Sequence, residues 1–292
     1  MGKESKINWT THTFNPWWGC VKVSDGCKYC YAESFSKRTG NNVWGVNASR
    51  RFFGDKHWNE PLKWNEAAKQ VGERHRVFCA SMADVFEDRE DLHAPRTRLF
   101  DLIRQTPELD WLLLTKRPEN IMPAIEKGFS IAYDDYDLPT VDMLANWDSG
   151  EPPVNVWLGT SVENQKAADE RIPHLLRVPA AVRFLSCEPL LGAVDIRFGV
   201  DPEPCDHARR SCAEIGCCGM EKIHWVIAGG ESGNGARPMQ EEWARSLMQQ
   251  CKGAGVAFWM KQLGGVRDKR HELEDLPEDL RVRELPKVAA PA

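Results

Sequence analysis

The chain has 292 residues, of which 42% are hydrophobic and 28% charged. This composition is typical of a soluble globular protein, and no stretch approaches the roughly 20 apolar residues of a membrane span, which excludes membrane insertion. The net charge of −5, from 38 Lys and Arg against 43 Asp and Glu, neither indicates nor excludes a nucleic-acid partner, since a local basic groove can lie on an acidic protein.

The N-terminal sequence MGKESKINWTTHTF lacks the apolar core of a signal peptide, so we expect a cytoplasmic protein. The chain contains ten cysteines. Because the cytoplasm keeps thiols reduced, that number indicates metal or redox chemistry before disulfides.

Three of these cysteines lie in the segment NPWWGCVKVSDGCKYCYAES, residues 15–34. Cys20, Cys27 and Cys30 have the spacing C-x6-C-x2-C, and the sequence predicts a loop there, between the first strand and a helix beginning near ESFSKR. A structural zinc site needs four ligands, so His12 or a distant residue would have to complete it. A 4Fe–4S cluster held by three thiolates leaves one iron open to a ligand that is not protein.

Short apolar runs then alternate with helical patterns along the chain. We predict strands in the runs 76–86, 110–118, 155–164, 182–191, 224–233 and 256–265, and helices in 94–107, 165–178 and 238–255. This alternation is typical of parallel βαβ units and predicts an α/β fold, a full or partial (β/α) TIM-like barrel over residues 1–265. An open doubly wound sheet is the alternative.

Two insertions interrupt this alternation. Residues 127–153 are acidic and turn-rich, and we expect a lid or surface excursion there. Residues 197–222 hold five possible metal ligands, Cys205, His207, Cys212, Cys217 and Cys218. They predict a second site for zinc or an iron–sulfur cluster, with a loop of free thiols as the alternative. Residues 266–292 form a charged tail that we expect to be loosely ordered.

Polar or glycine residues follow every predicted strand. In chain order they are Ser81 and Asp84, Thr115 and Lys116, Ser161 and Glu163, Cys187 and Glu188, Gly229, Gly230 and Glu231, then Lys261 and Gln262. Barrel enzymes carry their catalytic groups at the carboxyl ends of the strands, although loops are polar in any case. We predict catalytic roles for Lys116, Cys187, Glu188, Glu231 and Lys261.

The remaining cysteines have other interpretations. Cys79 and Cys251 lie in apolar contexts and are expected to be ordinary buried thiols. Cys187 is either such a thiol or a hydrogen donor that quenches a substrate radical.

Cations interleaved with aromatic residues occur near the predicted mouth of the barrel. Lys116, Arg117, Arg237, Lys261 and the segment SRRFFGDKHW (49–58) supply them. This combination suits a phosphate backbone with stacked bases, and solvated surface is the alternative.

The motif GCKYCYA resembles the end of the radical S-adenosylmethionine (SAM) cluster motif, although the first gap is six residues instead of the usual three. The ordered set NPWWGC, GCKYCYA, LLTKRP, GTSVEN, SCEPLL and GGESG with RPM, spread over residues 8–265, is similar to the phage-associated three-cysteine-motif proteins. That family is a radical-SAM-like group, long without an assigned function, often found in phage and prophage genomes. The TKR element is more distantly similar to spore photoproduct lyase, a radical SAM repair enzyme.

This resemblance implies that Cys20, Cys27 and Cys30 bind three irons of a 4Fe–4S cluster and that SAM chelates the fourth. One electron from an electron donor then cleaves SAM to methionine and a 5′-deoxyadenosyl radical, which abstracts hydrogen from a substrate. By position, Ser81 and Asp84 lie where the SAM amino group is usually bound. Ser161 and Glu163 would hold the ribose, and Gly229 and Gly230 would let the backbone approach the cofactor.

The leading hypothesis is therefore a radical SAM enzyme that modifies or repairs a base in DNA, RNA or a nucleotide, in a phage-related setting. A non-catalytic nucleic-acid-binding protein stabilised by zinc or an iron–sulfur cluster is the second hypothesis. A radical SAM enzyme acting on a small metabolite or peptide is the third.

Overall fold

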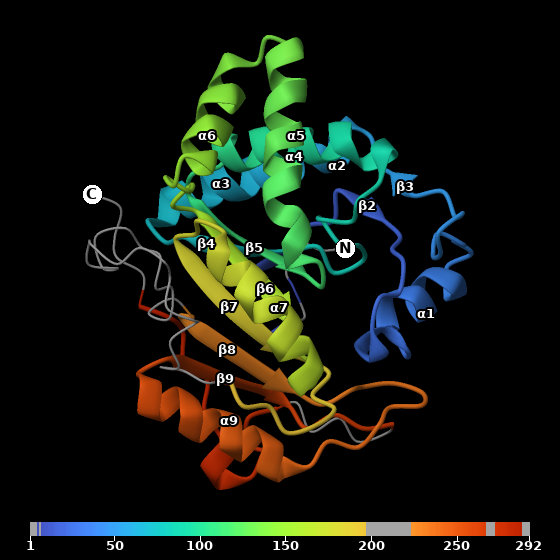
Figure 1. Ribbon diagram of the computed structural model, residues 1–292, viewed down its shortest axis with the longest axis vertical. Helices are drawn as coiled ribbons and strands as arrows, with labels where there is room; N and C mark the ends of the chain where they lie inside the picture. The colour runs from blue at the N-terminus through green and yellow to red at the C-terminus, as the bar shows by residue number, and fades with distance from the viewer. Residues whose placement is uncertain (1–4, 6, 197–222, 267–271, 288–292) are drawn as a thin grey trace, which may run out of the picture. The chain divides into compact units, whose positions relative to one another are not determined.

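The computed structural model describes residue 5 and residues 7–196, 223–266 and 272–287. It is a mixed α/β structure (Figure 1). Seven of its strands are β1 (His12–Thr13), β4 (His75–Cys79), β5 (Leu109–Thr115), β6 (Val156–Ser161), β7 (Val182–Cys187), β8 (Trp225–Gly229) and β9 (Ala257–Gln262). Their hydrogen-bonded order follows the sequence, β1-β4-β5-β6-β7-β8-β9.

The predicted strands and helices of the core are confirmed. Each of the six apolar runs overlaps one of the strands β4 to β9, and β4 and β5 begin one residue earlier than predicted. The pairs β1–β4, β4–β5, β7–β8 and β8–β9 are parallel. A doubly wound sheet reverses its strand order at a switch point, whereas these pairs add strands in sequence order. The arrangement is therefore compatible with a partial (β/α) barrel.

The chain divides into two compact units. The first comprises residues 1–159 and 179–181, and the second residues 160–178 and 182–292, so the division falls within β6. In the first unit the helices are α1 (Tyr31–Arg38), α2 (Asp55–Trp58), α3 (Glu60–Val71), α4 (His93–Gln105), α5 (Ile121–Asp134) and α6 (Leu138–Asp148). Short 3₁₀ turns lie at η1 (Asp25–Cys27), η2 (Glu90–Leu92) and η3 (Pro118–Asn120).

The core of the first unit lies between β1, β4, β5 and the helices α3 and α4. Phe14 and Trp111 are fully buried there, with their rings edge to face at 5.7 Å. Helix α3 ends where Gly72 takes a left-handed conformation, with φ of 69°, which glycine adopts without steric cost. A separate antiparallel pair joins β2 (Trp17–Trp18) to β3 (Arg51–Phe52).

Residues 127–153 differ from the expected turn-rich insertion, because most of them are helical. They form the end of α5 and all of α6, which Figure 1 shows as a pair joined by a short turn. Helix α6 has an N-terminal signal that accounts for it, since the Asp137 side chain accepts a hydrogen bond from the Thr140 amide and Pro139 lies in the first turn.

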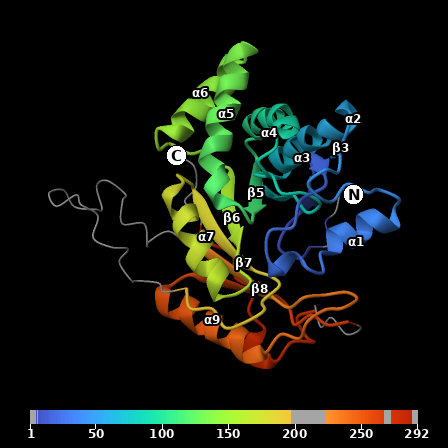
Figure 2. The same cartoon turned by 45° about the vertical axis from the view of Figure 1, so that its right-hand side comes forward.

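In the second unit, helix α7 (Gln165–Arg177) precedes β7, and α9 (Glu241–Ala254) packs on β8 and β9 (Figure 2). The sequence predicted both helices, including the glycine end of α9, where Gly255 has φ of 67°. Three buried rings, Phe184, Trp225 and Trp259, contact one another in series at 6.0 Å each.

The charged tail also differs from expectation over residues 272–287. The Met260 amide donates to the Val282 carbonyl at 2.8 Å, and the Glu284 amide donates to the Phe258 carbonyl at 2.9 Å, so this segment runs along β9. Leu280, in the turn η5 (Glu278–Leu280), is fully buried. The charge of the tail led us to expect a loosely ordered segment. In the sequence LRVRE (280–284), however, alternate residues are apolar, which is the pattern of a segment that packs along a sheet edge.

The second predicted metal site lies outside the described residues. It comprises Cys205, His207, Cys212, Cys217 and Cys218. Among the residues that are described, none of the helices is both long enough and apolar enough to cross a membrane.

Candidate functional site

The three-cysteine segment occupies the predicted position, a loop that ends at the first helix. Cys20 follows β2, Cys27 ends the turn η1, and Cys30 immediately precedes α1. All three thiols are partly exposed, whereas Cys79 and Cys251 are buried, as predicted. The loop therefore presents three accessible sulfur ligands.

Gly19 sets the start of this loop. Its φ is +117°, and its amide donates to the Met82 carbonyl at 3.0 Å. A Cβ atom built on Gly19 would lie 2.3 Å from the Val43 carbonyl oxygen. Only glycine fits there, because both the backbone angle and the close approach exclude a side chain.

We expect Gly19→Ala to lower the free energy of unfolding by several kcal/mol and to displace Cys20. Gly40→Ala is the matched control. Gly40 also has positive φ, +75°, but no atom lies within 4 Å of its built Cβ, so strain alone should cost about 1–2 kcal/mol. Urea unfolding of both variants measures the difference, and equal losses would contradict the assignment of a steric role to Gly19.

Asp84, at the end of the segment that follows β4, organises the polar network behind the loop. Its carboxylate accepts hydrogen bonds from Thr115 Oγ1 at 2.7 Å and from the Lys116 and Phe86 amides at 3.0 Å each. It also pairs with Arg117 Nη1 at 2.8 Å. Both charged side chains are more than nine-tenths buried. Each charge is therefore stabilised by its ionic partner and by protein hydrogen bonds in place of water.

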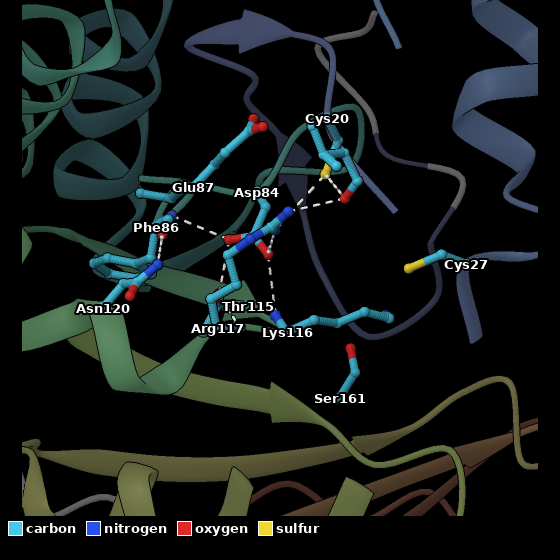
Figure 3. A network of polar contacts seen from close by, with 12 residues as sticks. Cys20, Cys27, Asp84, Phe86, Glu87, Thr115, Lys116, Arg117, Asn120 and Ser161 are labelled. Carbon is cyan, nitrogen blue, oxygen red and sulfur yellow. Dashed lines mark hydrogen bonds and ion pairs between the residues drawn. The ribbon is translucent and has the colours of Figure 1, made fainter. Parts of the chain in front are cut away.

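Arg117 connects this network to the cysteine loop (Figure 3). Its Nη2 donates to the Val21 carbonyl at 2.8 Å, and its Nη1 lies 3.8 Å from Cys20 Sγ. The guanidinium therefore contacts the loop at the first cysteine and at the residue that follows it. The sequence indicated Arg117 only as a cation near the mouth.

A second buried pair holds residues 43–48, which contact the start of the loop because the Gly45 amide donates to the Cys20 carbonyl at 3.0 Å. Arg50 Nη2 lies 2.6 Å from Glu87 Oε1, and Arg50 Nη1 donates to the Val43, Gly45 and Ala48 carbonyls. Sequence reasoning included Arg50 only within the cationic segment 49–58, and it missed Glu87. Nothing in the sequence joins two residues 37 positions apart, and their pairing appears only in the fold.

The environment raises the pKa of two of the thiols, those of Cys20 and Cys30. Burial raises the pKa of Cys20 to about 12, with a further contribution from the Asp84 carboxylate that the Arg117 guanidinium opposes. Burial also raises the pKa of Cys30. Thiolate ligation by a metal therefore has to displace protons at this loop.

Three cysteine thiols are suitable ligands for soft metals, but the three sulfur atoms do not lie close enough together to bind one metal ion. Within the parts of the chain that the structure describes, no group of three or more His, Cys, Asp or Glu side chains is placed to hold a metal ion. Cys27 lies apart from the network around Cys20 in Figure 3. His12, the alternative zinc ligand, is buried in β1, where its Nε2 is 3.1 Å from His75 Nδ1. A metal would have to draw the loop together.

Ser81 lies next to Asn15, which sequence reasoning also missed. Asn15 Nδ2 donates to Ser81 Oγ at 3.1 Å, and Asn15 Oδ1 accepts from the Met82 amide at 2.7 Å. The Tyr31 hydroxyl, one residue beyond Cys30, donates to the Ser81 carbonyl at 2.9 Å. These bonds bring Ser81 beside the end of the cysteine loop.

In the second unit, two of the predicted site carboxylates are held by arginines. Glu163 pairs with Arg171 at 2.7 Å, and Glu231 forms a bidentate pair with Arg237 at 2.7 and 2.9 Å. All of these side chains except Arg237 are more than nine-tenths buried. These carboxylates are positioned as fixed anions, each compensated by its arginine.

Glu188 and Lys261 form a more accessible pair at the ends of β7 and β9. Lys261 Nζ lies 2.5 Å from Glu188 Oε1, and each side chain is 21% exposed. Gly229 is adjacent, since a Cβ atom there would lie 3.5 Å from Glu188 Cδ. At Gly230 a Cβ atom would lie 2.0 Å from the Leu263 carbonyl oxygen. The structure thus explains Gly230 by backbone packing.

Cys187 and Ser161 are more enclosed than the rest. Cys187 is fully buried, and burial raises its pKa. Ser161 is 1% exposed. The surroundings of Cys187 are those of an ordinary buried thiol, the alternative that the sequence left open.

The chain belongs to the family described as "Protein of unknown function (DUF5131)", whose model matches residues 4–286. That match spans both compact units and the three-cysteine loop. No curated protein and no solved structure gives a significant match.

Proposed function

We propose that the protein is a radical SAM enzyme that acts on a nucleic-acid or nucleotide substrate. The observation that carries this proposal is the three-thiol loop tied by Arg117 to the carboxyl ends of neighbouring parallel strands. Cys20, Cys27 and Cys30 would hold a 4Fe–4S cluster. When bound, such a cluster supplies the electron that cleaves SAM.

The protein's own groups contribute position and charge. Arg117 fixes the Cys20 end of the loop through Val21 and Asp84. Tyr31 fixes the Cys30 end through the Ser81 carbonyl. With both ends of the loop attached to the segment after β4, the three thiolates would be held over the end of the parallel strands, where barrel enzymes bind their substrates.

The cofactor-binding roles of Ser81, Asp84, Ser161, Glu163, Gly229 and Gly230 belong to the same proposal. Asp84 has four protein hydrogen-bond donors in the structure. A SAM amino group would therefore compete with these donors at Asp84, whereas the Ser81 hydroxyl accepts a hydrogen bond from Asn15. Of the groups predicted to be catalytic, Lys116, Glu188 and Lys261 are proposed to face the substrate, whereas Cys187 is fully buried and Glu231 is buried against Arg237.

Anaerobic purification followed by iron, sulfide and zinc analysis tests the proposal. We expect about four irons and four sulfides per chain, and a paramagnetic signal of the reduced protein that changes when SAM is added. Zinc without sulfide, and no spectral response to SAM, would contradict the proposal and favour a non-catalytic metal-stabilised binding protein.

A further inference from the structure

A row of aromatic rings crosses the first unit beside the cysteine loop. Phe35 of α1 contacts Trp18 of β2, and Trp18 contacts Phe53, each at 5.9 Å between centroids. Phe53 then contacts His57 at 4.5 Å, and His57 stacks on Phe14 at 4.8 Å. The row joins α1, the β2–β3 pair and α2 (Figure 1).

Cations lie over this row. The Arg51 guanidinium is 4.7 Å from the Trp18 ring centroid and 5.3 Å from that of Phe53. The Arg38 guanidinium is 5.9 Å from the Phe35 ring. Neither arginine takes part in an ion pair with any described residue, so both retain an uncompensated charge beside an aromatic face.

The charge of the segment supports an anionic ligand. Residues 18–64 contain eight Lys and Arg but only four Asp and Glu, a net charge of +4 within a chain whose net charge is −5. Such an asymmetry is the electrostatic footprint of a polyanion-binding region.

Large aromatic side chains remain exposed on the same segment. The exposed fractions are 57% for Tyr31, 46% for Phe52 and 37% for Phe35. Tyr31 and Phe35 are four residues apart on α1 and therefore lie on one face of that helix. Exposed aromatic rings near cations are typical of an interaction site.

The row ends at a cavity. It is an open pocket of about 520 Å³ lined by nine residues, with aromatic walls formed by Phe14, Phe53, His57 and Trp64 and with Asp55, Lys56 and Glu60 also on its lining. The buried Trp64 Nε1 has no hydrogen-bond partner among the residues that the structure describes. A volume of this size accommodates a planar heteroaromatic group.

We propose that this surface, formed by α1, the β2–β3 pair and α2, binds single-stranded nucleic acid. Bases stack on the exposed rings and on the Arg38 and Arg51 planes, the phosphates face the cations, and the cavity at the end of the row receives one base. This surface would bind the nucleic-acid substrate of the proposed radical SAM enzyme, so its role in catalysis rests on the proposed function. Binding itself requires neither iron nor SAM.

A single strand fits these features better than a duplex. Stacking on a side-chain ring requires a base face that is not already stacked on its neighbours. Backbone contacts alone would need only the cations. Stacking on the aromatic residues is therefore the contact that distinguishes a single strand from a duplex.

Fluorescence anisotropy of the full chain with labelled oligothymidylate and oligouridylate tests the proposal, with and without reconstituted iron. Arg38→Gln with Arg51→Gln is expected to weaken binding and to reduce the slope of log affinity against log salt by about 1.4, since each lost phosphate contact on a single strand contributes about 0.7. Phe35→Ala is expected to weaken binding at least about fivefold at every salt concentration.

Matched controls use exposed residues elsewhere. Lys127→Gln with Arg177→Gln removes the same charge, and Tyr133→Ala removes a ring that is 62% exposed on α5. These variants should bind as the wild type does, and thermal unfolding confirms that every variant is folded.

Three results would overturn the proposal: no binding of either oligonucleotide at low salt, equal losses in the test and control variants, or duplex DNA or polyglutamate competing as well as the single strand. Preserved nucleic-acid binding by protein whose iron-loaded form leaves SAM intact under reducing conditions would refute the radical enzyme while leaving this surface in place.

Discussion

Replacing Cys20, Cys27 or Cys30 with alanine is expected to remove iron from the purified protein and to reduce SAM cleavage to background. A cluster held by three thiolates cannot be retained by two, because an iron would lose its protein ligand. The three sulfurs lie on one loop and are all partly exposed, so each substitution should leave the fold intact. Iron analysis and the yield of 5′-deoxyadenosine measure the two effects.

Cys251→Ala is the matched control for these variants. Cys251 is fully buried on α9, in the second unit. Its replacement removes a thiol and creates a small cavity, so stability should fall while iron remains bound. Iron that persists when all three loop cysteines are replaced would show that the loop is not the ligand set.

Asp84→Ala is expected to lower the free energy of unfolding by about 3–5 kcal/mol, because it leaves the buried charge of Arg117 uncompensated. The same change removes the acceptor of Thr115 Oγ1 and of the Lys116 amide. Because Arg117 also holds the loop at Val21, iron affinity should fall together with stability. Urea unfolding measures the first effect and iron analysis the second.

Asp55→Ala provides the comparison for Asp84. Asp55 pairs with Arg98 at 2.7 Å, but its side chain is 80% exposed. Exposed ion pairs contribute about 0–1 kcal/mol, so this variant should unfold nearly as the wild type does. A loss of similar size in both variants would show that the Asp84 network has no special structural role.

The parallel strands could be predicted from sequence because they are short, apolar and buried. DWLLLT and VRFLSC read as core strands without any tertiary information, and they form β5 and β7. The cysteine loop could also be placed, since it lies between the first apolar segment and an evident helix start. Its support by Arg50 and Arg117 could not, because both pair with carboxylates more than 30 residues away.

For one segment whose structure was predicted wrongly, residues 127–153, the sequence did contain the signal for a helix. The acidic residues of 127–153 suggested turns, yet Asp137 is the helix-capping residue of α6. Aspartate favours both turns and helix N-termini, and only the following apolar periodicity separates the two. The pattern Asp137, Pro139, Thr140 with Val141 and Leu144 behind it was sufficient to predict a helix.

The polar residues at the strand ends of the second unit could not be ranked as site candidates from the sequence. Sequence position alone indicated Glu163, Glu188 and Glu231 as equivalent candidates. In the fold, Glu163 and Glu231 are buried against arginines, whereas Glu188 and Lys261 keep a fifth of their surface exposed. The Glu188 and Lys261 pair is therefore the better candidate for contact with a substrate in this unit.

Under the proposed function, the three-cysteine loop serves reductive cleavage of SAM. Mass spectrometry of anaerobic reactions that contain iron-loaded protein, dithionite and SAM tests it most directly. We predict 5′-deoxyadenosine in the wild-type reaction, its dependence on dithionite, and its absence with Cys30→Ala. Protein that carries its full iron and sulfide but leaves SAM intact under these conditions would contradict the account.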